Sequence, residues 1–327
     1  MEAITILQAI QNKKFNIPTL RNINITKKRF GLPKAEPGAC GVVVQVGLNG
    51  QKKALRVSRI ELKKIQQRYQ LIINYFRSNP NSYFINVDYY ASSLQIGKKA
   101  YDCMVMDWVE GKDMKTYVEA NLYNSAALNR LADDFLKMTC ILHNKKIAHG
   151  DLHDGNILIL PNGQIKLIDY DSLYIPTLGC DFLDSIKGKQ GYQHSKRITN
   201  KYSNQTLDYF SEWVIYLSLK AIAERPNLWK KYKVKGKNDG FLFDVEDFKK
   251  PNQSAIFVEL GQMSVTIQNL RSNLINAINA PNIETIKPLC KVLPCNHLGN
   301  TQPIVSISSI RQRVVPIPNI LKKNRLV

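Results

Sequence analysis

HGDLHDGNIL, residues 149–158, and IKLIDYD, residues 165–171, carry three polar side chains at a spacing that decides the fold. Asp151 lies five residues before Asn156, and Asp169 ends the apolar run of the second stretch. Phosphoryl transfer from ATP needs one carboxylate to orient the acceptor hydroxyl. It also needs an amide and a second carboxylate to hold Mg²⁺ against the phosphates. Together the two stretches predict a site of this chemistry.

The residues between the two stretches also favour an ordinary β-hairpin with a polar turn. Asn162-Gly163 is a two-residue turn signal, and it lies between the apolar runs 157–160 and 165–168. A hairpin alone explains the apolar runs but not the three polar positions. Both interpretations therefore predict the same local backbone, and only the first predicts a site.

The pattern H-x-D-x-x-x-x-N followed by D-x-x resembles the catalytic core of the protein-kinase-like superfamily. The form H-G-D-L-H-x-G-N with D-Y-D resembles that of uncharacterised bacterial atypical serine/threonine kinase-like proteins, over roughly residues 35–260. The resemblance implies an α+β, bilobal fold with a small β-rich N-lobe containing one helix and a mainly α-helical C-lobe. It also implies ATP and Mg²⁺ as cofactors.

The resemblance assigns roles to the residues of the opening motif. Asp151 is the expected base, and His149 is expected to brace the loop beside it. Asn156 and Asp169 are the expected Mg²⁺ ligands. His153 stands where protein serine/threonine kinases usually carry lysine, a form also found in aminoglycoside and choline kinases.

Two more features of the C-lobe follow from the same resemblance. Asp208, at the start of an apolar helical run, is expected to support the catalytic loop by accepting backbone hydrogen bonds. Asp171 occupies the place of the glycine in the family's D-F-G motif. Without that glycine the segment that follows is expected to be less mobile.

The strands ahead of the motif are expected to hold the nucleotide. Gly38, Gly41 and Val43 match the second half of a glycine-rich loop over the phosphates, and a plain hairpin turn is the alternative. Ala54 and Arg56 share one face of the next strand, where the family carries alanine and lysine. Arginine keeps the charge but is bulkier and forked, so this substitution is not conservative.

The helix expected over residues 58–76 takes the place of the kinase C-helix. Its one acid, Glu61, lies close after the strand. The family's partner glutamate sits deeper in the helix, where this chain has Gln66, Gln67 and Arg68. The sequence does not say which residue pairs with the arginine of the strand, although Arg68-Tyr69 is a candidate.

The strand ending in Met106-Asp107 and the following residues resemble a kinase hinge. Met106 is in the gatekeeper position, and the backbone near Val109 is expected to bond adenine. Asp107 is included in the same cofactor-binding set. For Asp113 two roles remain open, contact with a ribose hydroxyl or capping of the next helix.

Composition limits the other possibilities. The chain has 327 residues, a formal charge of +20 and 44% hydrophobic residues, which suits a basic globular protein. No apolar run reaches about 18 residues, and the N-terminus does not resemble a signal peptide. The six scattered cysteines indicate reduced thiols, so the expected location is cytoplasmic.

We divide the chain into a basic extension (1–35), the N-lobe (36–110), the C-lobe (111–290) and a loosely ordered basic tail (291–327). The leading hypothesis is an ATP- and Mg²⁺-dependent kinase acting on a protein serine or threonine. The alternatives are a pseudokinase that binds nucleotide or serves as a scaffold, and a small-molecule kinase. The charge also allows acidic proteins or nucleic acid as partners, or merely keeps the protein soluble.

Overall fold

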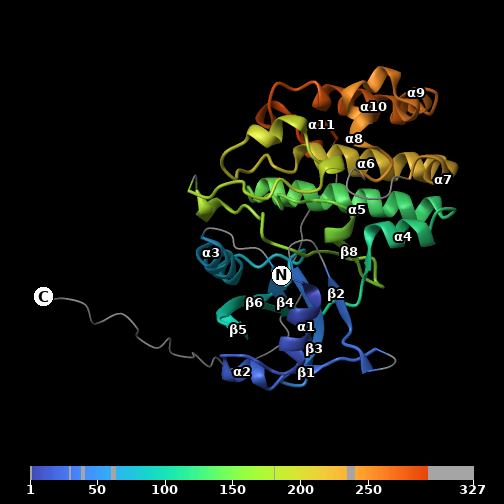
Figure 1. Ribbon diagram of the computed structural model, residues 1–327. Coiled ribbons are helices and arrows are strands. Elements are labelled where there is room, and N and C mark those ends of the chain that lie inside the picture. Colours follow the sequence, from blue (N-terminus) through green and yellow to red (C-terminus); the bar gives the residue numbers. More distant parts are fainter. Residues whose placement is uncertain are drawn as a thin grey trace, which may run out of the picture. The chain divides into compact units, whose positions relative to one another are not determined.

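The computed structural model describes residues 2–28, 31–37, 41–59, 64–179, 181–233 and 240–293. They form a β-sheet covered by short helices and a larger, mainly helical part (Figure 1). One apolar core lies within the small lobe, and a second runs through the large lobe. The expected α+β fold with a small β-rich lobe and a large helical lobe is therefore confirmed.

The small lobe is built on a six-stranded sheet in the order β1-β3-β4-β6-β5, with β2 paired to β3. A turn at Asn49 and Gly50 joins β3 to β4, and both residues have positive φ, 51° and 76°, as a type I′ turn requires. The strands are Asn24–Ile25 (β1), Ala35–Pro37 (β2), Gly41–Leu48 (β3), Gln51–Ser58 (β4), Val87–Ile96 (β5) and Lys99–Asp107 (β6).

Two helices from the start of the chain, α1 (Ala3–Gln11) and α2 (Pro18–Arg21), share one core with this sheet. Ile6 and Ile10 recur at a helical step, so both point to one face and are fully buried. Burying side chains of this size contributes about 1.5–3 kcal/mol each. The first helices are thus an integral part of the small lobe.

The helix α3 (Ile65–Ser78) lies between the sheet and the large lobe. Its Tyr69 and Ile72 belong to the core of the large lobe, together with Phe84 and Met104 of the small lobe. A helix was expected over residues 58–76. The described helix begins at Ile65, and residues 60–63, which include Glu61, lie outside the described part.

The large lobe is centred on two long antiparallel helices, α5 (Ser125–Asn144) and α6 (Tyr209–Glu224) (Figure 1). Because α6 packs against both α5 and α10, it is buried on nearly all sides, which explains its continuous apolar sequence. The remaining helices are α4 (Met114–Ala120), α7 (Asn227–Tyr232), α8 (Val245–Lys249), α9 (Ala255–Leu260), α10 (Val265–Ile278) and α11 (Leu289–Val292).

A small second sheet, in the order β7-β8-β9, closes the large lobe beneath the first sheet. Its strands are Lys112–Asp113 (β7), Ile157–Ile159 (β8) and Ile165–Leu167 (β9). The expected hairpin is therefore present as β8-β9. The 3₁₀-helices are Asp154–Asn156, Pro176–Leu178, Gln190–Tyr192, Ser195–Thr199, Pro251–Gln253 and Ile283–Thr285.

Two expectations from composition meet different outcomes. Within the described ranges no helix is long and apolar enough to cross a membrane. Cys103 and Cys290 are free thiols, whereas Cys140 is disulfide-bonded. The expectation of reduced thiols throughout is therefore wrong for Cys140.

Candidate active site

The loop between α5 and β8 passes close to the segment that follows β9. Only glycine fits at residue 150, the second position of the H-G-D motif. Gly150 has φ 78°, in the left-handed region. A Cβ atom there would lie 2.3 Å from the carbonyl oxygen of Ser172. The close approach of these two backbones brings Asp151 and Asp169 to one site.

Asp208 holds this loop by its backbone N–H groups, as the sequence predicted. Its carboxylate accepts hydrogen bonds from the backbone N–H groups of His149 and Gly150, the latter at 2.8 Å. Burial raises the pKa of Asp208, and these bonds and the nearby imidazole oppose that rise. A buried carboxylate with these donors fixes the loop, because an unpaired one would be costly.

Both ring nitrogens of His149 are used in bracing the loop. Nε2 lies 2.8 Å from the carbonyl oxygen of Ile168, and Nδ1 accepts from the backbone N–H of Asp151 at 3.3 Å. Because Nδ1 accepts a hydrogen bond, Nε2 is the nitrogen that can donate to the carbonyl oxygen of Ile168. The fully buried ring therefore ties the loop to the segment carrying Asp169.

Asp151 faces Lys189, in the segment that follows the D-Y-D motif. Its Oδ1 accepts from the backbone N–H of Lys189 at 2.9 Å, and its Oδ2 lies 3.8 Å from Nε2 of His153. The ammonium of Lys189 lies 3.2 Å from Asp154. Although burial raises the pKa of Asp154, hydrogen bonding from His153 and the charge of Lys189 hold it well below its usual range.

Asn156 and Asp169 offer oxygens of the kind that Mg²⁺ prefers. Asn156 donates from Nδ2 to the carbonyl oxygen of Asp151 at 2.9 Å, which orients its amide oxygen away from that bond. Oδ1 of Asp169 is buried and has no hydrogen-bond partner among the described residues. An amide oxygen and an orphaned carboxylate oxygen fit a cation that takes its other ligands from phosphates and water.

The electrostatics of Asp169 fit the same cation. Removal from water raises the pKa of its carboxyl group, the charge of Arg56 opposes this, and the neighbouring Asp171 and Asp151 raise it further. Its φ of 67° is unusual for a residue other than glycine and indicates local backbone strain. A divalent cation beside it would offset the cost of keeping three carboxylates together.

Arg56 enters the site from β4 and pairs with Asp171. Nη1 lies 2.9 Å from Oδ1 of Asp171 and Nη2 lies 2.5 Å from Oδ2, so the pair is bidentate. Nη2 also lies 3.4 Å from Oδ1 of Asp169. Tyr69 of α3 donates to Oδ1 of Asp171 at 2.7 Å. The sequence analysis had identified Arg56 and Tyr69 but not their common partner.

The proposed glycine loop and adenine positions lie around β3, β4 and β6. Gly41 is required by space, since a Cβ atom would lie 2.8 Å from the carbonyl oxygen of Val57. Val43 is opposite Arg56, and Ala54 is opposite Met106, so these residues follow adjacent strands. Gly38 lies outside the described residues.

The residues at the hinge make bonds of their own. Asp107 pairs with Lys53 at 2.5 Å, and Val109 is partly buried in the connection between β6 and β7. Asp113 caps α4, accepting from the backbone N–H and the hydroxyl of Thr116, both at 2.8 Å. Of its two possible roles the cap is present, and the ribose contact stays a prediction.

Three site contacts were missed because they join distant parts of the chain. Asp171 binds residues more than a hundred positions earlier, and no local pattern announces this. Lys189 contacts Asp151 through its backbone N–H, a contact that no side-chain pattern indicates. The one available signal was that Arg56 and Asp171 both depart from the family pattern, which suggests that they compensate each other.

Comparison with known proteins agrees with this geometry. The family described as "Protein kinase domain" matches residues 37–279. "Serine/threonine-protein kinase pakA" of Talaromyces marneffei is 28% identical over 145 residues, which are 44% of this chain and 22% of that protein. "Serine/threonine-protein kinase HAL5" of Candida glabrata is 23% identical over 216 residues, 62% of this chain and 26% of that protein. The chain spans less than a third of the length of these relatives.

Proposed function

Because the chain belongs to the protein kinase domain family, we propose that it transfers the γ-phosphate of ATP to a serine or threonine hydroxyl of a protein. The relatives that it matches are named serine/threonine-protein kinases. The H-G-D-L-H-x-G-N loop and the D-Y-D motif support the finer placement beside bacterial atypical kinase-like proteins.

The observation that carries the proposal is that two side-chain hydrogen bonds hold Asp151, Asn156 and Asp169 close together. His149 bridges the loop to Ile168, the residue before Asp169, and Asn156 bonds to the carbonyl oxygen of Asp151. A proton acceptor and two cation ligands are therefore held by each other, without help from a substrate. Such preorganisation is what catalysis by positioning requires.

In this mechanism Asp151 orients the acceptor hydroxyl and takes its proton as the phosphoryl group moves. Asn156 and Asp169 would hold Mg²⁺, which neutralises the charge that the phosphates carry during transfer. Arg56 supports the phosphates from β4. Asp208 keeps the loop in place, and the Lys189 backbone N–H limits the orientations open to the Asp151 carboxylate.

The test compares the wild type with Asp151→Asn. We expect the wild type to transfer radiolabelled phosphate from Mg²⁺-ATP to itself or to dephosphorylated casein. The variant should lose about 10²–10⁴-fold in rate, the usual contribution of a general base. ATP should raise the melting temperature of both proteins equally. Asp133→Asn, which changes an exposed carboxylate on α5, is the matched control and should keep full activity.

A pseudokinase is the second candidate, and one observation favours it. Both Nη atoms of Arg56 are already engaged by Asp171, so fewer donors remain for phosphate. A wild-type protein that is stabilised by ATP but transfers no phosphate to any acceptor would support this alternative. Transfer to an aminoglycoside or choline but not to protein would indicate a small-molecule kinase.

A further inference from the structure

We propose that Arg56 and Asp171 act as a compensating pair, in which Asp171 holds the guanidinium of Arg56 away from the metal ligand Asp169. In the same arrangement, Tyr69 connects the position of α3 to this pair. Arg56, Asp171 and Tyr69 are then positioning residues, and the two departures from the family pattern in β4 and in D-Y-D have one explanation. This inference deepens the proposed function and rests on its nucleotide site.

The first step is that Arg56 is a buried cation with a choice of two anions. Its side chain is 5% exposed, and its Nη2 lies 2.5 Å from Asp171 and 3.4 Å from Asp169. A buried guanidinium needs a carboxylate partner, because leaving it unpaired is strongly destabilising. Without the charge of Asp171, the nearest remaining carboxylate among the described residues is Asp169.

The second step is that Asp169 cannot serve both partners well. Its Oδ1 is the atom nearest Arg56 and also the oxygen that lacks a hydrogen bond. A guanidinium that moved onto this oxygen would compete with Mg²⁺ for the same ligand. The bidentate bond to Asp171 fixes the guanidinium plane and prevents this. Loss of Asp171 should therefore appear first as weaker binding of the metal.

The third step concerns α3, which contains no acidic residue between Ile65 and Ser78. Gln66 and Gln67 are exposed, whereas Arg68 and Tyr69 face inward. The helix therefore cannot offer Arg56 a carboxylate of its own. It contacts the pair indirectly, through the hydroxyl of Tyr69, which donates to the same Asp171 oxygen that Nη1 contacts.

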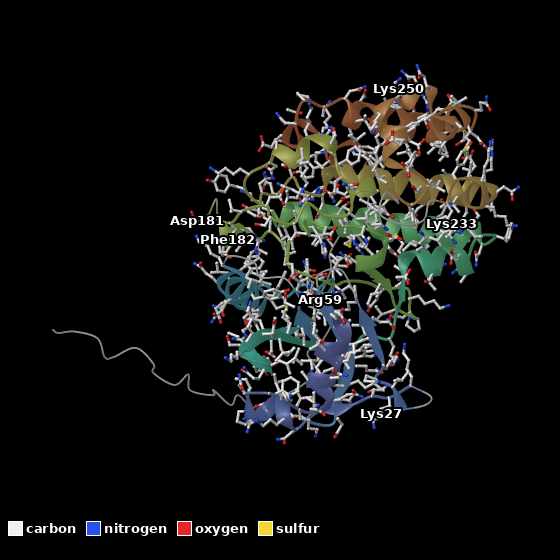
Figure 2. All side chains as sticks on the ribbon, viewed as in Figure 1. Lys27, Arg59, Asp181, Phe182, Lys233 and Lys250 are labelled. Carbon is white, nitrogen blue, oxygen red and sulfur yellow. The ribbon has the colours of Figure 1, made fainter. Side chains whose placement is uncertain are left out.

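Arg68 extends this contact to the segment after Asp171. Its Nη1 donates to the carbonyl oxygen of Leu173 at 2.9 Å, and its Nη2 donates to that of Leu183 at 3.2 Å. Its guanidinium lies 5.2 Å from the ring of Phe182, which Figure 2 shows on the segment beside α3. Two neighbouring residues of α3 thus hold the segment at both ends.

A cavity of about 550 Å³ lies between the start of α3 and the segment 181–186, and it borders both Asp171 and Arg68. Beside this cavity, Tyr69 and Ile72 of α3 share the apolar core with Leu173. The hydroxyl of Tyr69 and the guanidinium of Arg68 add direct bonds to the segment. A shift of α3 would consequently be transmitted to Asp171 and then to Arg56.

The test measures how much Mg²⁺ is needed for ATP to raise the melting temperature, a readout that does not require phosphate transfer. Asp171→Asn keeps the side-chain volume and an acceptor for Tyr69 but removes the charge. We expect the Mg²⁺ concentration at half-maximal effect to rise about tenfold, because the released guanidinium of Arg56 competes with Mg²⁺ for Asp169. Tyr170→Phe removes a buried hydroxyl between the two aspartates of the D-Y-D motif. This control should leave the Mg²⁺ requirement unchanged.

A second variant shows whether Arg56 causes the change. Adding Arg56→Met to Asp171→Asn removes the competing cation, so the Mg²⁺ requirement should return to that of the wild type even if transfer stays slow. An unchanged requirement in Asp171→Asn, or no return in the double variant, would overturn the proposal. Wild-type protein that responds to Mg²⁺-ATP without transferring phosphate would instead overturn the proposed function alone.

Tyr69→Phe provides the same measurement if Asp171→Asn does not fold. It retains both charges and removes only the hydroxyl, and we expect the Mg²⁺ requirement to rise about two- to threefold, the effect of one lost hydrogen bond. If the Mg²⁺ requirement does not rise in this variant, α3 does not act on the pair of Arg56 and Asp171. A wild-type protein with no response to Mg²⁺-ATP would overturn both the inference and the proposed function.

Discussion

The catalytic loop and strand β4 lie on opposite sides of one site, but they are held in different ways. The loop is held by contacts that the motif itself supplies: Asn156 bonds to Asp151, and His149 reaches the residue before Asp169. Arg56 of β4 is held by Asp171, which lies 115 residues later in the chain. The contacts of the loop follow from the spacing of its motif. The contact of Arg56 with Asp171 forms only when distant parts of the chain fold together.

The difference teaches where substitutions can be tolerated. A residue of the loop has several partners that depend on its exact position, so a single change disturbs them all. Arg56 and Asp171 depend mainly on each other, so a change in one can be compensated in the other. We expect single substitutions on the loop side to abolish transfer, and those on the strand side to reduce it.

The largest expected effect tests the loop side of this comparison. Asp169→Asn removes the charge of the proposed metal ligand and should reduce the rate of transfer by about 10³-fold, the scale of losing one electrostatic stabiliser of the transition state. The rate is measured under saturating ATP at several Mg²⁺ concentrations. Asp88→Asn, an exposed carboxylate on β5, is the control and should behave as wild type.

The comparison would fail if Asp169→Asn cost no more than Asp171→Asn under the same conditions. Equal losses would mean that the two carboxylates act as one unit, rather than one as ligand and the other as the partner of Arg56. Asp169→Glu adds a further measurement. It keeps the charge but moves it, and recovery of activity would show that position matters less than charge.

The same contrast explains which parts of the molecule the sequence could predict. The spacing of Asp151, Asn156 and Asp169 predicted a common site, and Asn156 bonds to the carbonyl oxygen of Asp151 only five residues away. The hairpin that follows was predicted for the same reason, from Asn162-Gly163. The apolar run that begins at Asp208 likewise predicted the helix α6 of the large lobe.

The remainder depended on contacts that no periodicity encodes. The partner of Arg56 was sought on the neighbouring helix, since that is where the family carries it, and it lies on the D-Y-D segment instead. Lys189 contacts Asp151 through its backbone, which no side-chain pattern records. Lys27, Lys233 and Lys250 lie far apart on the molecule, so the large positive charge did not indicate one site (Figure 2).

The second expected effect is a pH dependence of stability that distinguishes the large lobe from the small lobe. In the large lobe, His143 of α5 lies 2.6 Å from Glu212 of α6. Although burial lowers the pKa of His143, the charge of Glu212 raises it to about 9. In the small lobe, Asp169 and Asp171 outweigh burial and raise the pKa of Arg56. Only the first pair therefore titrates between neutral and mildly alkaline pH.

The sign of the effect follows from the folded and unfolded pKa values of His143. Its pKa in the unfolded chain is about 6.5, so the stabilisation is fully present below that pH and is lost as pH rises through about 9. The loss is at most roughly 3 kcal/mol. Melting temperatures measured between about pH 6.5 and about pH 10 should fall in the wild type.

His143→Gln is the control for this pH dependence, because glutamine cannot titrate. We expect the variant to be less stable than the wild type at neutral pH and to lose most of the slope between neutral and alkaline pH. Arg56→Lys should keep the full slope, since that site does not titrate in the range. An unchanged slope in His143→Gln would mean that another group, and not this pair, makes the large lobe sensitive to alkali.

The smallest expected effect concerns Asp113, where the chain passes from the hinge into the large lobe. Its carboxylate caps α4 through Thr116, so Asp113→Ala should cost about 1 kcal/mol of stability. Asp113→Ser keeps a capping oxygen on a shorter side chain and should be nearly as stable as the wild type.

If the cap is the whole role of Asp113, neither variant changes the KM for ATP. If Asp113 also binds the ribose, both variants raise that KM by about tenfold, because a hydrogen bond to a charged group is lost. Measuring stability and KM on the same two variants therefore assigns Asp113 either to the fold of the large lobe alone or also to the nucleotide site.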